Sequence, residues 1–243
     1  LENNGALSKK TKQYLAIKAF KMIAEYDISI ADYFNRIGEK KSTVLPQYIT
    51  MALEKLTDLR YGENPHQQAA IYKRRKEPNQ TFRQLHGKEL SYNNYLDIDA
   101  AIAIASEFQL PGAVIIKHTN PCGAAIDDSL DVAYKRAYEA DSISAFGSIV
   151  GLNRTVDLKT ANELAQTFIE VIVAPHFDTE ARELLEKKVN LRLIETDLIS
   201  NKKNQKNIVV RDINNAFLVQ TSDDKKITSR SFECVTKQAP TKK

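Results

Sequence analysis

Cysteine is scarce in this sequence, because Cys122 and Cys234 are the only two among 243 residues. Two cysteines cannot form a disulfide framework, and their separation does not match a metal-binding motif. No apolar run approaches the roughly 18 residues that a membrane-spanning helix needs. The first ten residues, LENNGALSKK, lack the apolar core of a secretion signal. These absences predict a cytoplasmic protein that does not act at a membrane.

Common phosphate-binding and nucleophile motifs are also missing. Neither G-x-G-x-x-G nor G-x-x-x-x-G-K-[ST] occurs, which argues against the usual nucleotide loops, and no G-x-S-x-G elbow is present. NPCGA at 120–124 has the proline and cysteine of zinc deaminases but neither the second cysteine nor H-x-E, which excludes zinc deamination. The four histidines are His66, His86, His118 and His176. Their spacing is not that of a metal centre, so we predict no metal.

A strong charge of either sign is absent as well. The chain carries 35 basic and 31 acidic residues, which gives a formal net charge of +4. No Lys/Arg stretch is interleaved with aromatic residues, as grooves for single-stranded nucleic acid require. The mild basic excess therefore favours a small anionic substrate over a nucleic acid. The hydrophobic content of 42% is typical of a globular protein with a substantial core.

Residues 8–36 form the first patterned segment. Apolar residues recur there at three- and four-residue steps with lysines between them, which predicts an amphipathic helix. Ser8 is suited to cap its start and Gly38 to end it. The polar stretch GEKKST, at 38–43, indicates a linker. The chain has no initiator Met and this helix begins within ten residues, so we expect a fragment of a longer protein.

Helix and strand patterns alternate beyond the linker. Residues 48–62 begin as a strand and end in a turn, although a helix remains an alternative. Further apolar strands are expected at 113–117, 145–152, 170–175 and 191–195. Helices are expected at 97–108, 130–140, 157–169 and 179–187, with Asp97 and Asp157 as caps. This alternation predicts an α/β fold with a mostly parallel sheet and helices on both faces.

In such sheets, ligands gather beyond the carboxyl ends of the strands. Lys117 and His118 lie at such an end, and so do Ala174 and Pro175. Gly147 interrupts another apolar strand, which indicates close approach of a second group to its backbone.

The sequence GAVIIKHTNPCGAA, residues 112–125, sets Lys117 and His118 directly after an apolar strand. We expect NPCG to turn the chain sharply and to point backbone amides inward. A histidine can move a proton near neutral pH, and an adjacent lysine can stabilise a developing oxyanion. The simpler alternative is an exposed lysine beside a histidine that bonds a backbone carbonyl.

Other polar groups stand at positions where ligands bind. Arg60 and Tyr61 belong to LRYGENPHQQAAIY, residues 59–72, and Arg60 offers a planar fork that fits phosphate or carboxylate. Asn94 precedes the helix predicted from Asp97, where asparagines are more often turn formers. Glu170 begins a buried strand, where a carboxylate can pair with a cation or a polar ligand atom.

Five stretches together resemble the bifunctional AICAR transformylase/IMP cyclohydrolase family in its bacterial form. They are LRYGENPHQQAA, LSYNNYLDIDAA, IIKHTNPCGAA, YKRAYEADSISAFGSIV and EVIVAP. They occur in the family's order and span nearly all of residues 59–175. The resemblance implies a cytidine-deaminase-like half-domain without zinc. Residues 1–37 would be the helical tail of the cyclohydrolase domain, 38–43 a linker, and 44–243 the first half of the transformylase domain.

The resemblance also implies roles for individual residues. His118 would accept a proton and Lys117 would stabilise the transition state or the departing nitrogen. Arg60 and Tyr61 would hold the nucleotide. Asn94 and Gly147 would contribute at its ring and ribose end. Glu170 stands where some family members carry Asp, and Lys188 would be a phosphate partner.

The reaction that the resemblance implies is formyl transfer from the co-substrate 10-formyltetrahydrofolate to AICAR, giving FAICAR, without a metal. The whole protein would also be an IMP cyclohydrolase and would work as a homodimer. The catalytic residues of the cyclohydrolase would lie outside this chain. The alternative for the isolated chain is a non-catalytic half-domain that binds AICAR.

Overall fold

The structure is a computed structural model that describes residues 5–38, 45–74, 82–197, 199, 208–223, 225 and 234–238. It forms two compact units, Leu1–Thr50 with Asn204–Lys243, and Met51–Lys203. The predicted linker beyond Gly38 and the predicted loop at 201–207 lie outside the described residues.

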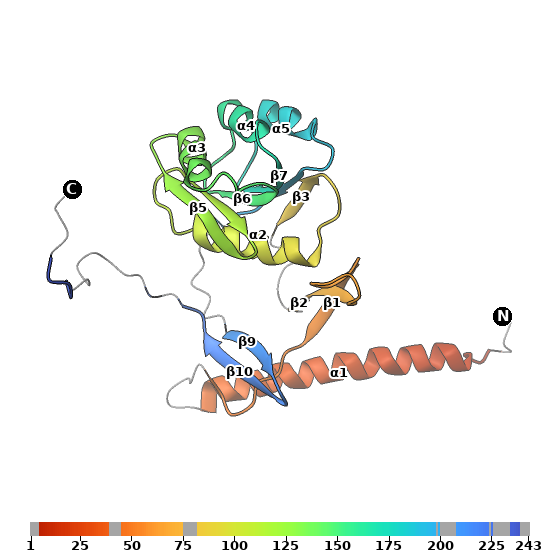
Figure 1. Cartoon of the computed structure of the whole chain (residues 1–243). Coiled ribbons are helices and arrows are strands. Elements are labelled where there is room, and N and C mark those ends of the chain that lie inside the picture. Colours follow the sequence, from red (N-terminus) through yellow and green to blue (C-terminus); the bar gives the residue numbers. More distant parts are fainter. Residues whose placement is uncertain are drawn as a thin grey trace. The chain divides into compact units, whose positions relative to one another are not determined.

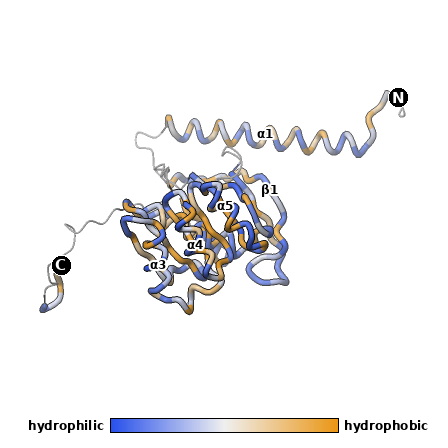
Figure 2. The backbone as a smooth tube through the Cα atoms, turned by 90° about the horizontal axis from the view of Figure 1, so that it is seen from above, coloured by the Kyte–Doolittle hydropathy of each residue, from blue (hydrophilic) through white to orange (hydrophobic). Residues whose placement is uncertain are grey.

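The first unit contains the predicted long helix, α1 (Lys9–Gly38). Ser8 caps it, since the Thr11 amide donates to Ser8 Oγ at 3.1 Å, and the helix ends at Gly38 as expected. Figure 2 shows apolar and polar residues in turn along α1. The same unit contains an antiparallel hairpin of β9 (Ile208–Ile213) and β10 (Ala216–Thr221), which was not predicted.

The second unit is built on a six-stranded sheet with the order β3-β8-β7-β6-β4-β5. Its strands are β3 (Arg83–His86), β4 (Gly112–Lys117), β5 (Asn120–Ile126), β6 (Ser148–Leu152), β7 (Ile169–Ala174) and β8 (Arg192–Glu195). The central pairs β6–β7 and β7–β8 are parallel, and the other three pairs are antiparallel. Four of the six strands, β5 to β8, thus run in one direction. The predicted α/β class is confirmed.

Helices cover both faces of this sheet, as predicted (Figure 1). One face carries α2 (Tyr92–Ala105), and the other carries α3 (Leu130–Ala140), α4 (Leu158–Ala165) and α5 (Thr179–Glu186). The sheet residues that pack with α2 include Val114, Ile116, Ile149, Val171 and Val173. Those on the opposite face include Ile115, Val150, Leu152, Ile172 and Leu193. Each such side chain, fully buried, contributes about 1.5–3 kcal/mol to folding.

The start of α2 corrects the prediction that Asp97 is its cap. Ser91 caps the helix, because its Oγ accepts the Asn94 amide at 3.2 Å while Asn94 Oδ1 accepts the Ser91 amide at 3.1 Å. This capping box places Asn94 in the first turn and Asp97 one turn further on. The predicted cap of α4 is confirmed, since Asp157 accepts the Thr160 amide at 2.8 Å.

A two-stranded sheet precedes the large one in the same unit. β1 (Leu53–Leu59) pairs antiparallel with β2 (Ala69–Arg74), so the strand interpretation of residues 48–62 is correct and the helical alternative is not. No helix among the described residues combines the length and the apolar character needed to cross a membrane.

Candidate active site

One end of the strands in the six-stranded sheet collects four of the eight candidate residues. Ile149 of β6 pairs with Ile116 of β4 on one side and with Val171 of β7 on the other. The register continues from Val171 to Arg192 of β8. The carboxyl end of β4 therefore meets the amino ends of β6, β7 and β8. We call this row of strand ends the site edge, which is distinct from the edge strands β3 and β5. The candidate residues on it are Lys117, His118, Gly147 and Glu170.

The strand directions correct one expectation. Because β4 runs antiparallel to β6, its carboxyl end and the carboxyl end of β7 lie at opposite edges of the sheet. Ala174 ends β7, so it and Pro175 lie away from Lys117 and His118. Of β4 and β7, only β4 therefore has its carboxyl end at the site edge.

His118 occupies the tip of a tight hairpin rather than the start of a longer turn. Lys117 pairs with Asn120, so only His118 and Thr119 connect β4 to β5. Both have left-handed backbones, with φ of 52° and 63°. The expected turn over NPCG is wrong, because residues 120–123 are part of β5. Pro121 is tolerated there since β5 is an edge strand.

Lys117 is joined to the segment before β6. Its Nζ donates to the carbonyl oxygens of Phe146 at 2.6 Å and Gly147 at 3.3 Å. Gly147 precedes β6 rather than interrupting it, and its φ of 67° is left-handed. Its amide donates to the Phe168 carbonyl at 2.9 Å. The close approach predicted at Gly147 is confirmed by this contact, and an added Cβ would lie 3.3 Å from the Phe168 ring.

Asn94 and Glu170 meet across the α2 face of the site edge. Asn94 is buried, and its Nδ2 donates to Glu170 Oε2 at 3.4 Å. Arg192 Nη1 lies 3.7 Å from the same oxygen. The Arg192 Nε donates to the Lys88 and Glu89 carbonyls at 3.2 and 3.3 Å, so the guanidinium is fixed on both sides. One carboxylate oxygen of Glu170 is thus engaged by two partners.

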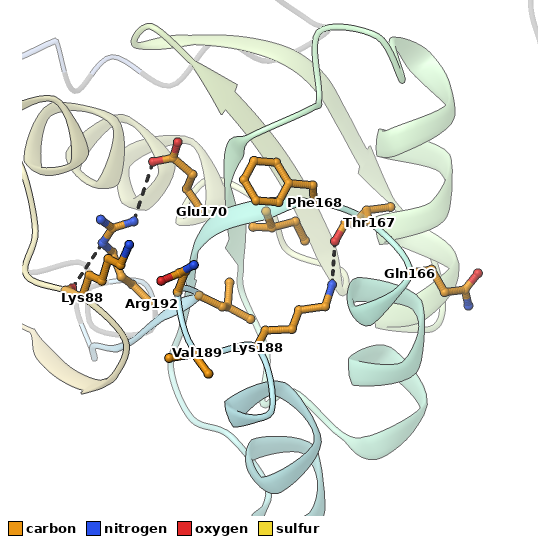
Figure 3. Close-up of a pocket in the computed structure, with 11 residues that line it drawn as sticks. Lys88, Gln166, Thr167, Phe168, Glu170, Lys188, Val189 and Arg192 are labelled. Carbon is orange, nitrogen blue, oxygen red and sulfur yellow. Dashed lines mark hydrogen bonds and ion pairs between the residues drawn. The ribbon is translucent and has the colours of Figure 1, made fainter.

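An open pocket of about 610 Å³ lies beside Glu170 (Figure 3). Three of its lining residues are cationic, Lys88, Lys188 and Arg192, against one carboxylate, so the pocket suits an anion. The remaining lining residues are Gln166, Thr167, Phe168, Ile169, Val189, Asn190 and Leu191.

Lys188 is held toward this pocket by the turn before β7. Its Nζ donates to the Thr167 carbonyl at 2.7 Å, and burial lowers the pKa of its ammonium (Figure 3). Thr167 is fixed in turn, because its hydroxyl bonds the buried Tyr134 hydroxyl at 2.6 Å. Burial raises the pKa of Tyr134 to about 12, so this phenol stays protonated. The contact with Tyr134 therefore helps to hold in place the residue whose carbonyl accepts the Lys188 ammonium.

Arg60 and Tyr61 follow β1. Arg60 donates to the Tyr61 hydroxyl at 3.0 Å, and its guanidinium lies 4.8 Å from the centre of the Tyr61 ring. Their loop reaches α2 through the Asn93 side chain, which donates to the Glu63 carbonyl at 3.3 Å. Within the described residues, no hydrogen bond or ion pair joins Arg60 or Tyr61 directly to the site edge.

Four residues of this region were not predicted as parts of a site: Lys88, Asp97, Phe168 and Arg192. Arg192 begins a buried strand with a charged residue, the same signal that drew attention to Glu170, and could have been found from it. The Phe168 ring packs against Phe146 at 4.8 Å between centroids. The sequence predicts Asp97 as a helix cap, and no local pattern indicates its contact with the hairpin.

Metal ligands do not gather in the part of the chain that the structure describes. No three His, Cys, Asp or Glu side chains lie together there as a metal ion would require. Burial raises the pKa of Cys122, which keeps its thiol protonated at neutral pH.

The fold and the site edge define an α/β protein that collects basic and hydrogen-bonding groups beside an open pocket. The chain belongs to the AICARFT/IMPCHase bienzyme family, whose sequence model matches residues 1–243. This confirms the family inferred from the motifs. The family's internal boundaries, at 37 and 44, remain a prediction for this chain.

Curated relatives carry the name bifunctional purine biosynthesis protein PurH. The one from Oceanobacillus iheyensis is 47% identical over 236 residues, which cover 95% of this chain and 45% of the relative. The one from Thermoanaerobacter sp. is 44% identical over 248 residues, covering 100% of this chain and 47% of the relative. A Listeria monocytogenes relative is also 44% identical. The chain thus spans about half the length of the curated relatives it matches.

Proposed function

We propose that the site edge binds AICAR and serves formyl transfer from 10-formyltetrahydrofolate, giving FAICAR, in a protein of the relatives' full length. That protein is called the full-length protein below. One observation carries the proposal: six of the eight candidate residues lie along this edge or its pocket. They are Asn94, Lys117, His118, Gly147, Glu170 and Lys188.

The chemistry needs a base and charge stabilisation together. The 5-amino group of AICAR is a poor nucleophile, because the ring and the carboxamide withdraw its lone pair. As the amine nitrogen bonds the formyl carbon, the bond from that carbon to N10 of the folate breaks. His118 accepts the proton that the amine loses, through the neighbouring carboxamide, and the proton ends on N10. His118 is exposed at the hairpin tip, where a substrate can reach it.

Lys117 supplies the positive charge. Its ammonium has three N–H donors, and the carbonyls of Phe146 and Gly147 take two of them. The third can turn to the formyl oxygen as negative charge develops there, or to the departing nitrogen. Two fixed acceptors also hold the ammonium in place before the substrate arrives.

The remaining candidates hold the nucleotide. Arg60 and Tyr61 form a stacked pair whose guanidinium fits a phosphate. Lys188 is a second phosphate partner, and an anion beside it offsets the burial that disfavours its charge. Asn94 and Gly147 contribute at the ring and ribose end. Glu170 Oε2 is engaged by Asn94 and Arg192, so Oε1 serves as the acceptor for a ligand hydroxyl.

The full-length protein is further proposed to be an IMP cyclohydrolase, because the family model is named for both enzymes and the curated relatives are named bifunctional. That it works as a homodimer stays a prediction of the family resemblance. A second candidate function applies to the 243-residue chain by itself: a half-domain that binds AICAR without transferring formyl groups. The observation that favours it is that the chain spans about half of its relatives. Calorimetry with AICAR together with a formyl-transfer assay on this chain distinguishes the two, since robust turnover would contradict the half-domain.

Replacing His118 tests the main proposal. In the full-length protein, His118→Ala should lower kcat for formyl transfer at least about a hundredfold, the usual effect of losing a general base. The folate absorbance change measures the rate. His176→Ala is the matched control, because His176 is an exposed histidine that follows β7 at the opposite edge. Near-normal turnover of His118→Ala, or an equal loss in the control, would contradict the assignment.

A further inference from the structure

The hairpin that carries His118 adopts a backbone that its residues disfavour. Two-residue hairpins with left-handed φ at both positions are ordinarily built from Asn-Gly or Gly-Gly. Here the positions hold His118 and Thr119, with φ of 52° and 63°. A β-branched residue such as Thr119 is a rare outlier in this region. Such a conformation persists only where surrounding contacts over-determine it.

Side chains bind both polar groups of the peptide between His118 and Thr119. The His118 carbonyl accepts Thr119 Oγ1 at 2.7 Å and Asn120 Nδ2 at 2.9 Å. The Thr119 amide donates to Asp97 Oδ1 at 2.7 Å. Rotation of this peptide plane would break all three bonds. The two contacts on the carbonyl come from the hairpin itself, and only Asp97 comes from outside it.

Asp97 can hold the hairpin in place because the part of α2 that carries it is capped and packed on the sheet. The helix starts at the Ser91–Asn94 capping box and is packed on the sheet through the buried residues Ile98 and Ala101. Asp97 lies three residues after Asn94, so both face the same side of the helix. That side bonds Glu170 through Asn94 and the hairpin through Asp97. It thereby sets the base and the nucleotide-binding groups at a fixed separation.

We propose that Asp97 is a positioning residue, which holds His118 in its place through the Thr119 amide. This inference rests on the proposed formyl transfer. Among the described residues, no hydrogen bond or ion pair joins Asp97 to the His118 imidazole, so its removal should misplace the base without weakening the nucleotide contacts.

Four variants of the full-length protein test this. Asp97→Ala should lower kcat about tenfold to a hundredfold, the range expected when a catalytic group moves by about 1 Å, with little change in KM for AICAR. Asp97→Asn keeps an acceptor and should retain most of the turnover that Asp97→Ala loses. Adding Thr119→Gly to Asp97→Ala should restore part of kcat, because glycine adopts a left-handed φ at no steric cost. Asp99→Ala, on the same helix, is the control.

A structural readout accompanies the kinetics and does not depend on activity. In the 243-residue chain, hydrogen exchange at the Thr119 amide should be slow, and Asp97→Ala should speed it at least about tenfold, as loss of one hydrogen bond predicts. Asp99→Ala should leave it unchanged. If Asp97→Ala does not fold, the same comparison is made with Asp97→Asn and Asp97→Ser, of which only the first should retain the slow exchange.

Normal kcat in Asp97→Ala, loss in Asp97→Asn equal to that in Asp97→Ala, or no recovery on adding Thr119→Gly would overturn the inference. His118→Ala, measured in parallel, separates the two claims. If His118→Ala is inactive and Asp97→Ala is fully active, only the role of Asp97 is wrong. If His118→Ala is active, the proposed function itself is wrong.

Discussion

Gly147 lies where three parts of the site edge meet. Its left-handed backbone directs its amide to the Phe168 carbonyl and its own carbonyl to Lys117. A Cβ added there would lie 3.3 Å from the Phe168 ring as well as close to Lys117. Both the conformation and the space thus favour glycine at this position.

Alanine at position 147 should therefore harm both stability and activity. A non-glycine residue with this φ costs about 1–2 kcal/mol, so Gly147→Ala should lower the free energy of unfolding by about that amount. Relaxation of the strained backbone would also move the Gly147 carbonyl that holds the Lys117 ammonium, which should reduce kcat of the full-length protein. Urea unfolding and the formyl-transfer assay measure the two effects. An unchanged unfolding free energy would show that the left-handed backbone is not required.

Single residues were predictable where a local pattern marks them. The end of an apolar run predicts that Lys117 and His118 lie at the carboxyl end of a strand, and β4 ends at Lys117. Asp97 was misassigned because an Asp before Ile-Asp-Ala-Ala resembles a helix cap, whereas the cap is Ser91. The contact of Asp97 with Thr119 spans 22 residues of sequence, and no local signal encodes it.

Elements were predictable where burial makes their pattern uniform. β4, β6 and β7 are nearly continuous runs of buried apolar residues, and all three were expected. The turn formers in NPCG predict a turn, whereas these residues begin β5, an edge strand that accommodates proline. The direction of β4 relative to β6 and β7 could not be predicted, because apolar runs look alike in either direction. β4 and β5 are antiparallel because a two-residue hairpin joins them.

The opposite edge of the sheet contains a charged cluster that makes stability depend on pH. Glu195 at the end of β8 accepts Arg83 Nη2 at 2.6 Å and contacts His176 Nδ1 at 2.9 Å. Burial opposes ionisation of Glu195, but the hydrogen bonds from Arg83 and His176 outweigh it, and its pKa lies below the ordinary value of 4.5. The unfolded chain therefore binds this proton more readily than the folded chain does.

It follows that the contribution of Glu195 to stability is complete above pH 4.5 and is lost as the pH falls through the lower folded-state pKa. Glu195→Gln should make the decline of unfolding free energy below pH 4.5 shallower. Urea unfolding at a series of pH values measures the slope. Glu183→Gln, on the exposed side of α5, is the control, and an identical slope in Glu195→Gln and the unaltered chain would count against this account.

The family model matches the whole chain. The chain nevertheless spans only about half the length of the curated relatives it matches. Within that half, the second unit gathers the candidate groups for the nucleotide and the base. The proposed formyl transfer requires AICAR to bind at the site edge, where β4 ends and β6, β7 and β8 begin. The opposite ends of the strands, where β7 ends at Ala174 and β8 at Glu195, should not contact AICAR.

Amide chemical shifts during an AICAR titration of the isotope-labelled 243-residue chain locate the binding site residue by residue. We expect changes that saturate together at the site edge, at Lys117, Thr119, Gly147, Glu170 and Arg192, with none at the opposite edge. Changes concentrated at Ala174, His176 and Glu195, or no change at either edge at millimolar AICAR, would contradict it.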